Sequence, residues 1–370
     1  MRILILNDAF VPSNGPARIL YRLAKEWINK GHSVAIITLK NKFEHTPDLP
    51  IEEVETKESP SFLLSIGKAL RVRRQLKNRI DEEYPDIIIS GGPILALLTP
   101  GKHPLVYRLG GIYPEELTCN FRHGLRGGLK AILKYIQTFL AIQKSKMLIS
   151  PSQFAAKANS KCFLKKASPI YNAVDGTVFN PEGKTLDLGE RSLLFVGEIR
   201  ARKGIDFLIK SFRAIEQRAP GTKLYIIGKS SHPKLLDSVQ ANEKNEKIVY
   251  LGTKDNVDEY MRGCDVFVFP SYAESFGLVI CEAQACGKPI VAFNTTAVPE
   301  VVEDNFSGFL VKKNDLDTFV DKVCLLLEND ELRENMGRNA KQFMGKFNWE
   351  KSAEEYIELF RTIKDGCKFR

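Results

Sequence analysis

One stretch of the chain indicates the fold most directly: Asp265-Val-Phe-Val-Phe-Pro-Ser-Tyr-Ala-Glu-Ser-Phe-Gly-Leu-Val-Ile-Cys-Glu282. A short apolar run, 265–269, precedes a loop that begins at Pro270 and then a segment of helical character. Open parallel sheets are built from such strand–loop–helix units, and they bind ligands at the carboxyl ends of their strands. The stretch therefore predicts an α/β fold with a ligand crevice after residue 269.

The helical segment carries groups that suit an anionic ligand. We expect its first turn, with free N–H groups that bind anions, to comprise Ser275, Phe276, Gly277, Leu278 and Val279. Glu274 lies in the loop and Glu282 lies one turn after Leu278, so the two carboxylates are expected to contact different parts of one ligand. The alternative is a solvated helix with two ordinary glutamates, and the strand–loop–helix context favours the site.

Similar units fill the rest of the 370 residues, a length that suits two α/β domains. Alternating strands and helices imply a parallel sheet with right-handed crossovers. The polar stretch 181–190 is the expected linker, and 352–364 is an expected amphipathic helix. The expected strands are 3–6, 34–37, 86–89, 105–107, 146–150 and 168–171 before the linker, and 191–196, 223–227, 248–251, 265–269, 289–292 and 308–311 after it.

Composition favours a cytoplasmic protein. The seven cysteines form no CxxC pair, which argues against a zinc site or a disulfide framework. The first apolar run is too short for a signal peptide, and the longest uncharged stretch, 87–101, is interrupted by Gly91-Gly92-Pro93. Charge is uneven: residues 1–180 hold 26 Lys+Arg and 15 Asp+Glu, whereas residues 181–370 hold 28 and 30. The basic half is expected to meet an anionic partner, either nucleic acid or a membrane surface.

Two further loops follow predicted strands. The loop after 196 carries Arg200, Arg202 and Lys203 between Gly197 and Gly204, and such cations can neutralise a diphosphate. A basic surface turn is the alternative. The loop 12–16 contains Gly15, which would let a ligand approach the backbone, although a simple strand-to-helix turn explains it equally well.

These blocks, in this order, resemble the family 4 retaining glycosyltransferases of the GT-B fold. The matching segments are Gly15 with Gly31 to Val34, Asn172 to Asp175 with Phe179, Gly197 to Gly204, Pro270 through Glu274 and Glu282 to Glu300, and Phe306 to Val311. The resemblance implies two Rossmann-like domains that face each other across a cleft. It assigns 1–180 to an acceptor-side domain and 181–351 to a nucleotide-sugar domain, with the C-terminal segment 352–370 crossing back to the first.

The resemblance also implies roles for individual residues. Glu282 would bind the donor ribose, and Glu274, with the backbone around Phe276 and Gly277, would hold the transferred sugar. Arg202 and Lys203 would neutralise the leaving diphosphate. Gly15 would close on the donor from the first domain, and Thr253 would border the nucleobase. Members need no metal or other cofactor, because the cations and the helix N-terminus supply the positive field.

The chain departs from the family pattern at three places. Glu198 follows Gly197 where members carry Arg, so Arg202 or Arg200 must serve. Ala173 stands in the usual Asn-Gly-Val-Asp motif. Gly110 stands near the position of an acceptor-side His, for which Arg108 is a candidate substitute.

The acidic pair Asp315 and Asp317 could suggest the metal-binding DxD motif of another glycosyltransferase fold, but we expect Asp315 to cap the helix 318–327. Two basic amphipathic stretches, 61–80 and 121–146, suit a glycan or lipid-linked acceptor at an anionic membrane, and the alternative is two core helices with solvated basic faces.

We therefore expect a retaining, metal-independent hexosyltransferase that uses a UDP- or GDP-linked sugar in cell-surface polysaccharide or glycolipid synthesis. A non-hydrolysing nucleotide-sugar epimerase is the alternative enzyme. A basic nucleic-acid-binding protein is the other alternative, which no helix-turn-helix, zinc finger or aromatic-rich basic strand supports. We expect no nucleic acid partner, and a cytoplasmic location with peripheral contact to the membrane.

Overall fold

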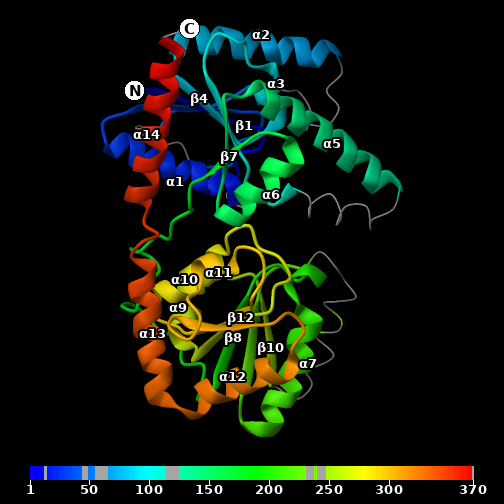
Figure 1. Cartoon of the computed structure of the whole chain (residues 1–370), viewed down its shortest axis with the longest axis vertical. Coiled ribbons are helices and arrows are strands. Elements are labelled where there is room, and N and C mark those ends of the chain that lie inside the picture. Colours follow the sequence, from blue (N-terminus) through cyan, green and yellow to red (C-terminus); the bar gives the residue numbers. More distant parts are fainter. Residues whose placement is uncertain are drawn as a thin grey trace. The chain divides into compact units, whose positions relative to one another are not determined.

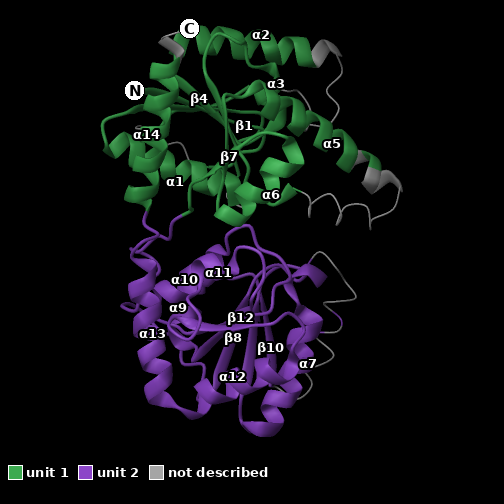
Figure 2. Ribbon diagram, viewed as in Figure 1, with its two compact units in different colours: residues 1–172, 349–370 green, residues 173–348 purple. Residues whose placement is uncertain are grey.

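The protein folds into two compact α/β units. The computed structural model describes residues 1–11, 15–43, 49–54, 66–113, 125–230, 237, 239 and 247–368. Residues 1–172 and 349–370 form the first unit and residues 173–348 form the second (Figures 1 and 2). Both units contain a parallel sheet with helices on its faces, so the predicted α/β class with two Rossmann-like domains is confirmed.

Within the described residues, the first unit has a seven-stranded parallel sheet in the order β3-β2-β1-β4-β5-β6-β7. Its central strands are continuous apolar runs, as expected of strands covered on both faces. The strands are β1 (Arg2–Asn7), β2 (Ser33–Thr38), β3 (Ile51–Glu53), β4 (Ile87–Ser90), β5 (Leu105–Arg108), β6 (Met147–Ser150) and β7 (Ala167–Pro169). The helices are α1 (Gly15–Asn29), α2 (Ile66–Glu83), α3 (Pro93–Leu98), α5 (Leu125–Lys144), α6 (Gln153–Phe163) and α14 (Trp349–Lys368).

The second unit has a six-stranded parallel sheet among its described residues, in the order β10-β9-β8-β11-β12-β13. The order reverses between β8 and β11, which places the crevice of such a sheet beside these two strands. The strands are β8 (Ser192–Val196), β9 (Lys223–Ile227), β10 (Ile248–Gly252), β11 (Val266–Phe269), β12 (Ile290–Phe293) and β13 (Gly308–Val311). The helices are η1 (Ala201–Lys203), α7 (Ile205–Arg218), α9 (Val257–Gly263), α10 (Leu278–Ala285), α11 (Val298–Val301), α12 (Leu316–Glu328) and α13 (Asp330–Met344).

The C-terminal helix α14 returns to the first unit, as expected. The indole Nε1 of Trp27 on α1 donates to the Ala353 carbonyl oxygen at 3.2 Å, and its ring packs edge-on against Tyr356 and Phe360. Lys364 near the end of the helix forms a 2.8 Å ion pair with Asp86. The helix runs from Trp349 to Lys368 and is therefore longer at both ends than the predicted 352–364.

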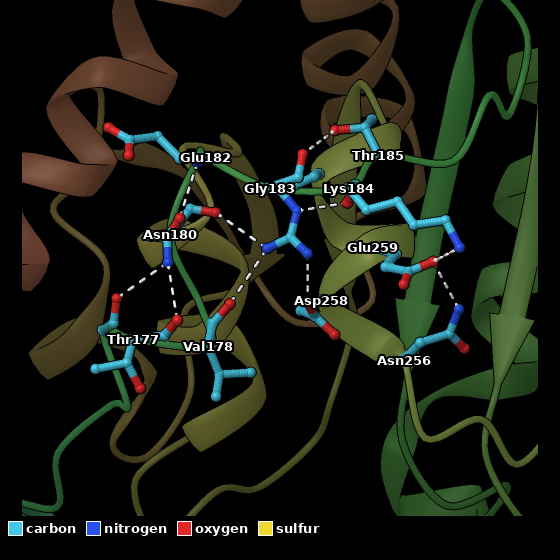
Figure 3. A network of polar contacts seen from close by, with 12 residues as sticks. Thr177, Val178, Asn180, Glu182, Gly183, Lys184, Thr185, Asn256, Asp258 and Glu259 are labelled. Carbon is cyan, nitrogen blue, oxygen red and sulfur yellow. Dashed lines mark hydrogen bonds and ion pairs between the residues drawn. The ribbon is translucent and has the colours of Figure 1, made fainter.

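The predicted linker is bound to the second unit rather than lying free, so the units divide at 172/173 instead of 180/181. Arg262 of α9 donates to the carbonyl oxygens of Val178, Asn180 and Lys184 at 3.2, 3.3 and 2.8 Å and forms an ion pair with Asp258 (Figure 3). These bonds satisfy the polar backbone of an extended segment that has no sheet partner. The segment therefore belongs to the unit that follows it.

Three smaller features can also be compared with the sequence analysis. Asp315 accepts from the Thr318 N–H at 3.2 Å, so its predicted capping role is confirmed. The strand β3 was not predicted, because three residues are too few to show alternation. No described helix is long and apolar enough to cross a membrane.

Candidate active site

The candidate site is centred on Glu274, in the loop after β11. Its Oε1 accepts a hydrogen bond from Lys203 Nζ at 2.6 Å and another from Ser271 Oγ at 2.6 Å. The Glu274 side chain is only 10% exposed and that of Lys203 only 14% exposed. A buried ion pair of this kind is stabilising only where its members are also hydrogen-bonded, as Glu274 is here.

A second loop supplies the cations. Arg202 and Lys203 lie on the short helix η1 after β8, and Arg202 Nη1 donates to the Ala273 carbonyl oxygen. In return, the Tyr272 N–H donates to the Arg202 carbonyl oxygen at 2.8 Å. The sheet order makes β8 and β11 neighbours, so their carboxyl-terminal loops meet although about 70 residues separate them.

The close contact of these loops depends on a glycine. Gly204 follows η1 with a φ of +73°, and a Cβ atom there would lie 2.0 Å from the Pro270 carbonyl oxygen. Only glycine combines the left-handed conformation with this approach. Lys203 also lies over the ring of Phe269, with Nζ 5.0 Å from the centroid.

The electrostatics favour an ionised Glu274. Burial raises the pKa of this carboxyl, but the charges of Lys203 and Arg202 and the hydrogen bonds from Lys203 and Ser271 outweigh burial, and the net pKa lies below its ordinary value. The carboxylate is therefore a hydrogen-bond acceptor at neutral pH, with oxygens able to accept from hydroxyl groups.

The helix α10 begins later than expected. Its first residue is Leu278, and Gly277 caps it with a φ of +95° and no side-chain cap bond. Ser275 and Phe276 therefore precede the helix and are not part of its first turn, which corrects the expectation for 275–279. The Phe276 side chain is buried against Phe347, with ring centroids 5.6 Å apart.

The other residues that sequence analysis assigned to the donor occupy separate places in the second unit. Glu282 is half-buried on α10, one turn after Leu278, as expected. Gly197 follows β8 and packs against Gly228, where a Cβ would lie 1.9 Å from the Gly197 carbonyl oxygen. Thr253 is exposed after β10. One strand, β9, lies between β10 and β8, and two strands, β9 and β8, lie between β10 and β11.

The two arginines that could replace the family residue are separated by the structure. Arg200 is about half-exposed and pairs with Glu198 at 2.8 Å. Arg202 instead contacts the Glu274 loop and contributes to the lowered pKa of Glu274. Of the two alternatives, Arg202 is the one that lies at the candidate site.

Arg108, the candidate substitute for the acceptor-side histidine, is held inside the first unit. It is 1% exposed, and it donates from Nε to the Tyr356 hydroxyl at 2.9 Å and from Nη2 to Asn172 Oδ1 at 2.6 Å. Its guanidinium thus joins β5 to α14 inside the first unit. Gly110 lies where a Cβ would be 2.6 Å from Pro16 Cγ, so this position has no room for a histidine while Pro16 stays in place.

Other expectations concern the start of α1 and the basic stretches. Gly15 is the exposed first residue of α1, and residues 12–14 of its loop lie outside the described part of the chain. Residues 61–65 and 121–124 of the two basic stretches also lie outside it. The residues described there form α2 and α5.

Sequence analysis missed one residue of the candidate site, Thr296, and one buried carboxylate of the first unit, Asp8. Thr296, after β12, accepts the Glu274 N–H on its Oγ1 at 2.8 Å, and no local motif indicates this contact across 22 residues. Asp8, after β1, accepts the N–H groups of Ile94 and Leu95 at 3.0 and 2.9 Å, and burial raises its pKa to about 6 in spite of these bonds. The polar residue after a buried strand was the available signal at both positions.

A metal site is not indicated in the part of the chain that is described. No group of three or more His, Cys, Asp or Glu residues there could hold a metal ion. The charged groups around Glu274 are the cations Arg202 and Lys203, which suit an anionic ligand.

Fold and site together define an α/β protein with two Rossmann-like units of the GT-B type and a cationic cluster in the second. Two family models match: Glycosyltransferase Family 4 over residues 13–177 and Glycosyl transferases group 1 over residues 179–343. The capsular polysaccharide biosynthesis glycosyltransferase CapM of Staphylococcus aureus is 31% identical over 76% of this chain and 78% of its own length. The chain therefore belongs to family 4 of the glycosyltransferases.

Two further comparisons agree. An uncharacterised glycosyltransferase of Methanocaldococcus jannaschii is 31% identical over 61% of this chain, and the match spans 62% of that relative's length, less than two thirds. The sucrose-phosphate synthase structure from Thermosynechococcus elongatus superposes with a TM-score of 0.80 over 99% of this chain and 100% of that one, at 18% identity. This structural likeness concerns the fold alone.

Proposed function

We propose that the protein is a retaining, metal-independent glycosyltransferase that moves a hexosyl group from a UDP- or GDP-linked sugar to a glycan or lipid-linked acceptor. The observation that carries this proposal is the Glu274 cluster, in which two cations and one buried carboxylate meet after β8 and β11. Arg202 and Lys203 would stabilise charge on the departing diphosphate, while Glu274 would accept hydrogen bonds from sugar hydroxyls. The name of CapM supports a role in cell-surface polysaccharide synthesis.

The same cluster supports metal independence, and the match to family 4 supports retention. Cations and helix-terminal amides can supply the positive field that a metal supplies in other transferases. Glu282 would bind the ribose, Gly197 would border the diphosphate, and Thr253 would lie by the nucleobase. Product stereochemistry by NMR, measured with and without EDTA, tests both points: an inverted anomer or loss of activity in EDTA contradicts them.

The first experiment is a thermal-shift screen against nucleoside diphosphates and nucleotide sugars, because a ligand that binds the native state raises the melting temperature. Glu274→Gln should lower transfer by about 100-fold or more, a typical cost for a residue that contacts the reacting group, and should leave the fold intact. Glu216→Gln is the matched control, because it removes a carboxylate that pairs with Lys247 on the surface of the same unit.

Full activity in Glu274→Gln would rule out the assigned sugar site. The products separate the two enzyme alternatives. Release of nucleoside diphosphate coupled to a larger glycan indicates a transferase, whereas an epimerised sugar without acceptor indicates an epimerase. Steeply salt-dependent DNA binding without nucleotide-sugar affinity would favour the nucleic-acid alternative.

We also propose an anionic membrane surface as partner of the first unit. Helix α5 exposes a line of apolar side chains, three or four residues apart, and they are 41–60% exposed: Leu129, Ile132, Ile136 and Leu140. Helix α2 buries Val72, Leu76 and Ile80, and it exposes Arg71, Arg73, Arg74 and Lys77. Both α2 and α5 contact α3. The apolar line of α5 and the basic residues of α2 therefore lie on two helices that pack against the same third helix.

Charge complementarity supports an anionic membrane surface as this partner. Basic residues near anionic lipids contribute on the order of 1 kcal/mol each, and exposed apolar side chains can enter the headgroup region. Lys144 is excluded from this surface, because its Nζ donates to the carbonyl oxygens of Ala96, Leu97 and Thr99 at the end of α3. Burial accordingly lowers the pKa of Lys144.

The protein should sediment with phosphatidylglycerol vesicles at low salt and much less with phosphatidylcholine vesicles. Replacing Ile136 and Leu140 together by Ser should reduce sedimentation, because it removes apolar side chains that are 46% and 50% exposed. Leu325→Ser is the control, an exposed leucine of α12 in the other unit. Equal partition into both vesicle types, or into neither, contradicts the membrane proposal.

A further inference from the structure

Thr296, next to the Glu274 loop, has an unfavourable backbone conformation. It follows β12 with a φ of +48°, in the left-handed region where a β-branched side chain is strained. The other non-glycine residues with positive φ in the described part of the chain are not β-branched: Tyr84, Leu164, Arg191, Asn305 and Asn314. Such strain persists only where the surrounding structure imposes it, and it occurs preferentially at functional sites.

The strained conformation places polar groups of the β12 loop against Glu274. Thr296 Oγ1 accepts the Glu274 N–H at 2.8 Å, and the Ala297 N–H approaches the Glu274 carbonyl oxygen at 3.4 Å. The neighbouring Thr295 hydroxyl donates to the Ser271 carbonyl oxygen at 3.0 Å. The β12 loop thus holds the backbone of Glu274, while Lys203 and Ser271 hold its carboxylate.

A turn that served only to connect β12 to α11 would not require threonine. Asparagine tolerates this backbone region better, and the chain uses it at Asn305 and Asn314, where φ is +60° and +65°. At 296 the chain instead carries a residue that strains the backbone and supplies a hydroxyl. The hydroxyl meets the one backbone N–H of the residue assigned to the sugar.

We propose that Thr296 is a positioning residue for the transferred sugar. It fixes the backbone of Glu274, so that the carboxylate stays on the side of the loop where Lys203 and Arg202 lie. The inference rests on the proposed function, because it assumes that Glu274 binds the sugar. Thr296 itself touches Glu274 and is not required to touch the ligand.

The experiment separates the hydroxyl from the strain by three substitutions. Thr296→Ser keeps the hydroxyl without the β-branch, Thr296→Val keeps the β-branch without the hydroxyl, and Thr296→Gly lacks both. Each variant is tested for its melting temperature and for its dissociation constants with UDP, UDP-glucose, UDP-N-acetylglucosamine, GDP and GDP-mannose. The ratio of the constants for the free diphosphate and its sugar reports the sugar site alone.

The three variants should rank differently by melting temperature and by the ratio of dissociation constants. Thr296→Ser should melt no lower than the wild type and should keep its affinity ratio. Thr296→Gly and Thr296→Val should both lose about tenfold in this ratio, as for one hydrogen bond, with diphosphate affinity unchanged. The Gly variant should melt above the Val variant, because it is free of strain. Leu164→Gly is the control: it relieves a φ of +51° at an exposed residue of the first unit and should leave the ratio unchanged.

The outcomes distinguish this inference from the proposed function. A wild type that binds none of these nucleotides overturns the proposed function and the inference with it. A wild type that binds a nucleotide sugar, with unchanged ratios in the Gly and Val variants, overturns the role of Thr296 alone. If the variants lose diphosphate affinity and sugar affinity together, in proportion to a fall in melting temperature, Thr296 has a structural role only. That result also overturns its role as a positioning residue.

Discussion

At the scale of single residues, the site depends on the balance between burial and charge at Glu274. Sequence analysis could nominate Glu274, Arg202 and Lys203, because each follows an apolar strand in a loop of suitable composition. It could not choose between Arg200 and Arg202. Their side chains differ in what they contact: Arg202 donates to the Ala273 carbonyl oxygen, whereas Arg200 pairs with Glu198. Nor could it foresee that Arg108 would be used within the first unit, since its partners lie 64 and 248 residues away.

The lowered pKa of Glu274 predicts a specific dependence of stability on pH. Because this pKa lies below the ordinary value of 4.5, the ionised carboxylate stabilises the fold above that pH, and the contribution is lost as pH falls through the lower, folded-state pKa. The free energy of unfolding lost in Glu274→Gln should therefore be largest near neutral pH and should shrink below about 4.5. Urea unfolding of both proteins between pH 3 and 7 (on the order of five points) measures this. A difference that grows on acidification contradicts the ionised carboxylate.

At the scale of elements, strand–loop–helix units were predictable because parallel strands buried on both faces form continuous apolar runs. The starts of helices were less predictable. The helix α10 begins at Leu278 because Gly277 adopts a left-handed conformation, and this shortens the turn that anion binding was expected to use. The short strand β3 has three residues, too few for a pattern to be recognised, whereas β7, of equal length, overlaps the predicted strand 168–171.

The contact between η1 and the β11 loop gives a prediction at this scale. Gly204→Ala should destabilise the protein by about 2 kcal/mol or more and should weaken nucleotide binding, because the added Cβ would meet the Pro270 carbonyl oxygen. Gly189→Ala is the matched control. It has a similar φ of +77° but open space around its Cβ, so only the conformational cost of about 1 kcal/mol is expected. Denaturant unfolding and titration with UDP compare them, and equal effects would show that the contact is unimportant.

At the scale of the whole molecule, the chain runs from the first unit into the second and back. The family resemblance predicted that the C-terminal segment returns to the first unit, and the amphipathic pattern of 352–364 agreed with this. The place of the division was not predictable from composition. Residues 181–190 have the polarity of a free linker, but Arg262, a side chain 8% exposed, binds the backbone just before and within this stretch.

The two points at which the chain passes between the units lie close together on each side. In the second unit the Val174 N–H donates to the Phe347 carbonyl oxygen at 3.1 Å, and in the first the Ser352 hydroxyl donates to the Tyr171 carbonyl oxygen at 2.9 Å. Topologically, the second unit is an insertion into a single loop of the first, with its ends side by side. The coding sequence for residues 173–348 could therefore be exchanged for that of a relative by two crossovers, without any new spacer and with the first unit unchanged.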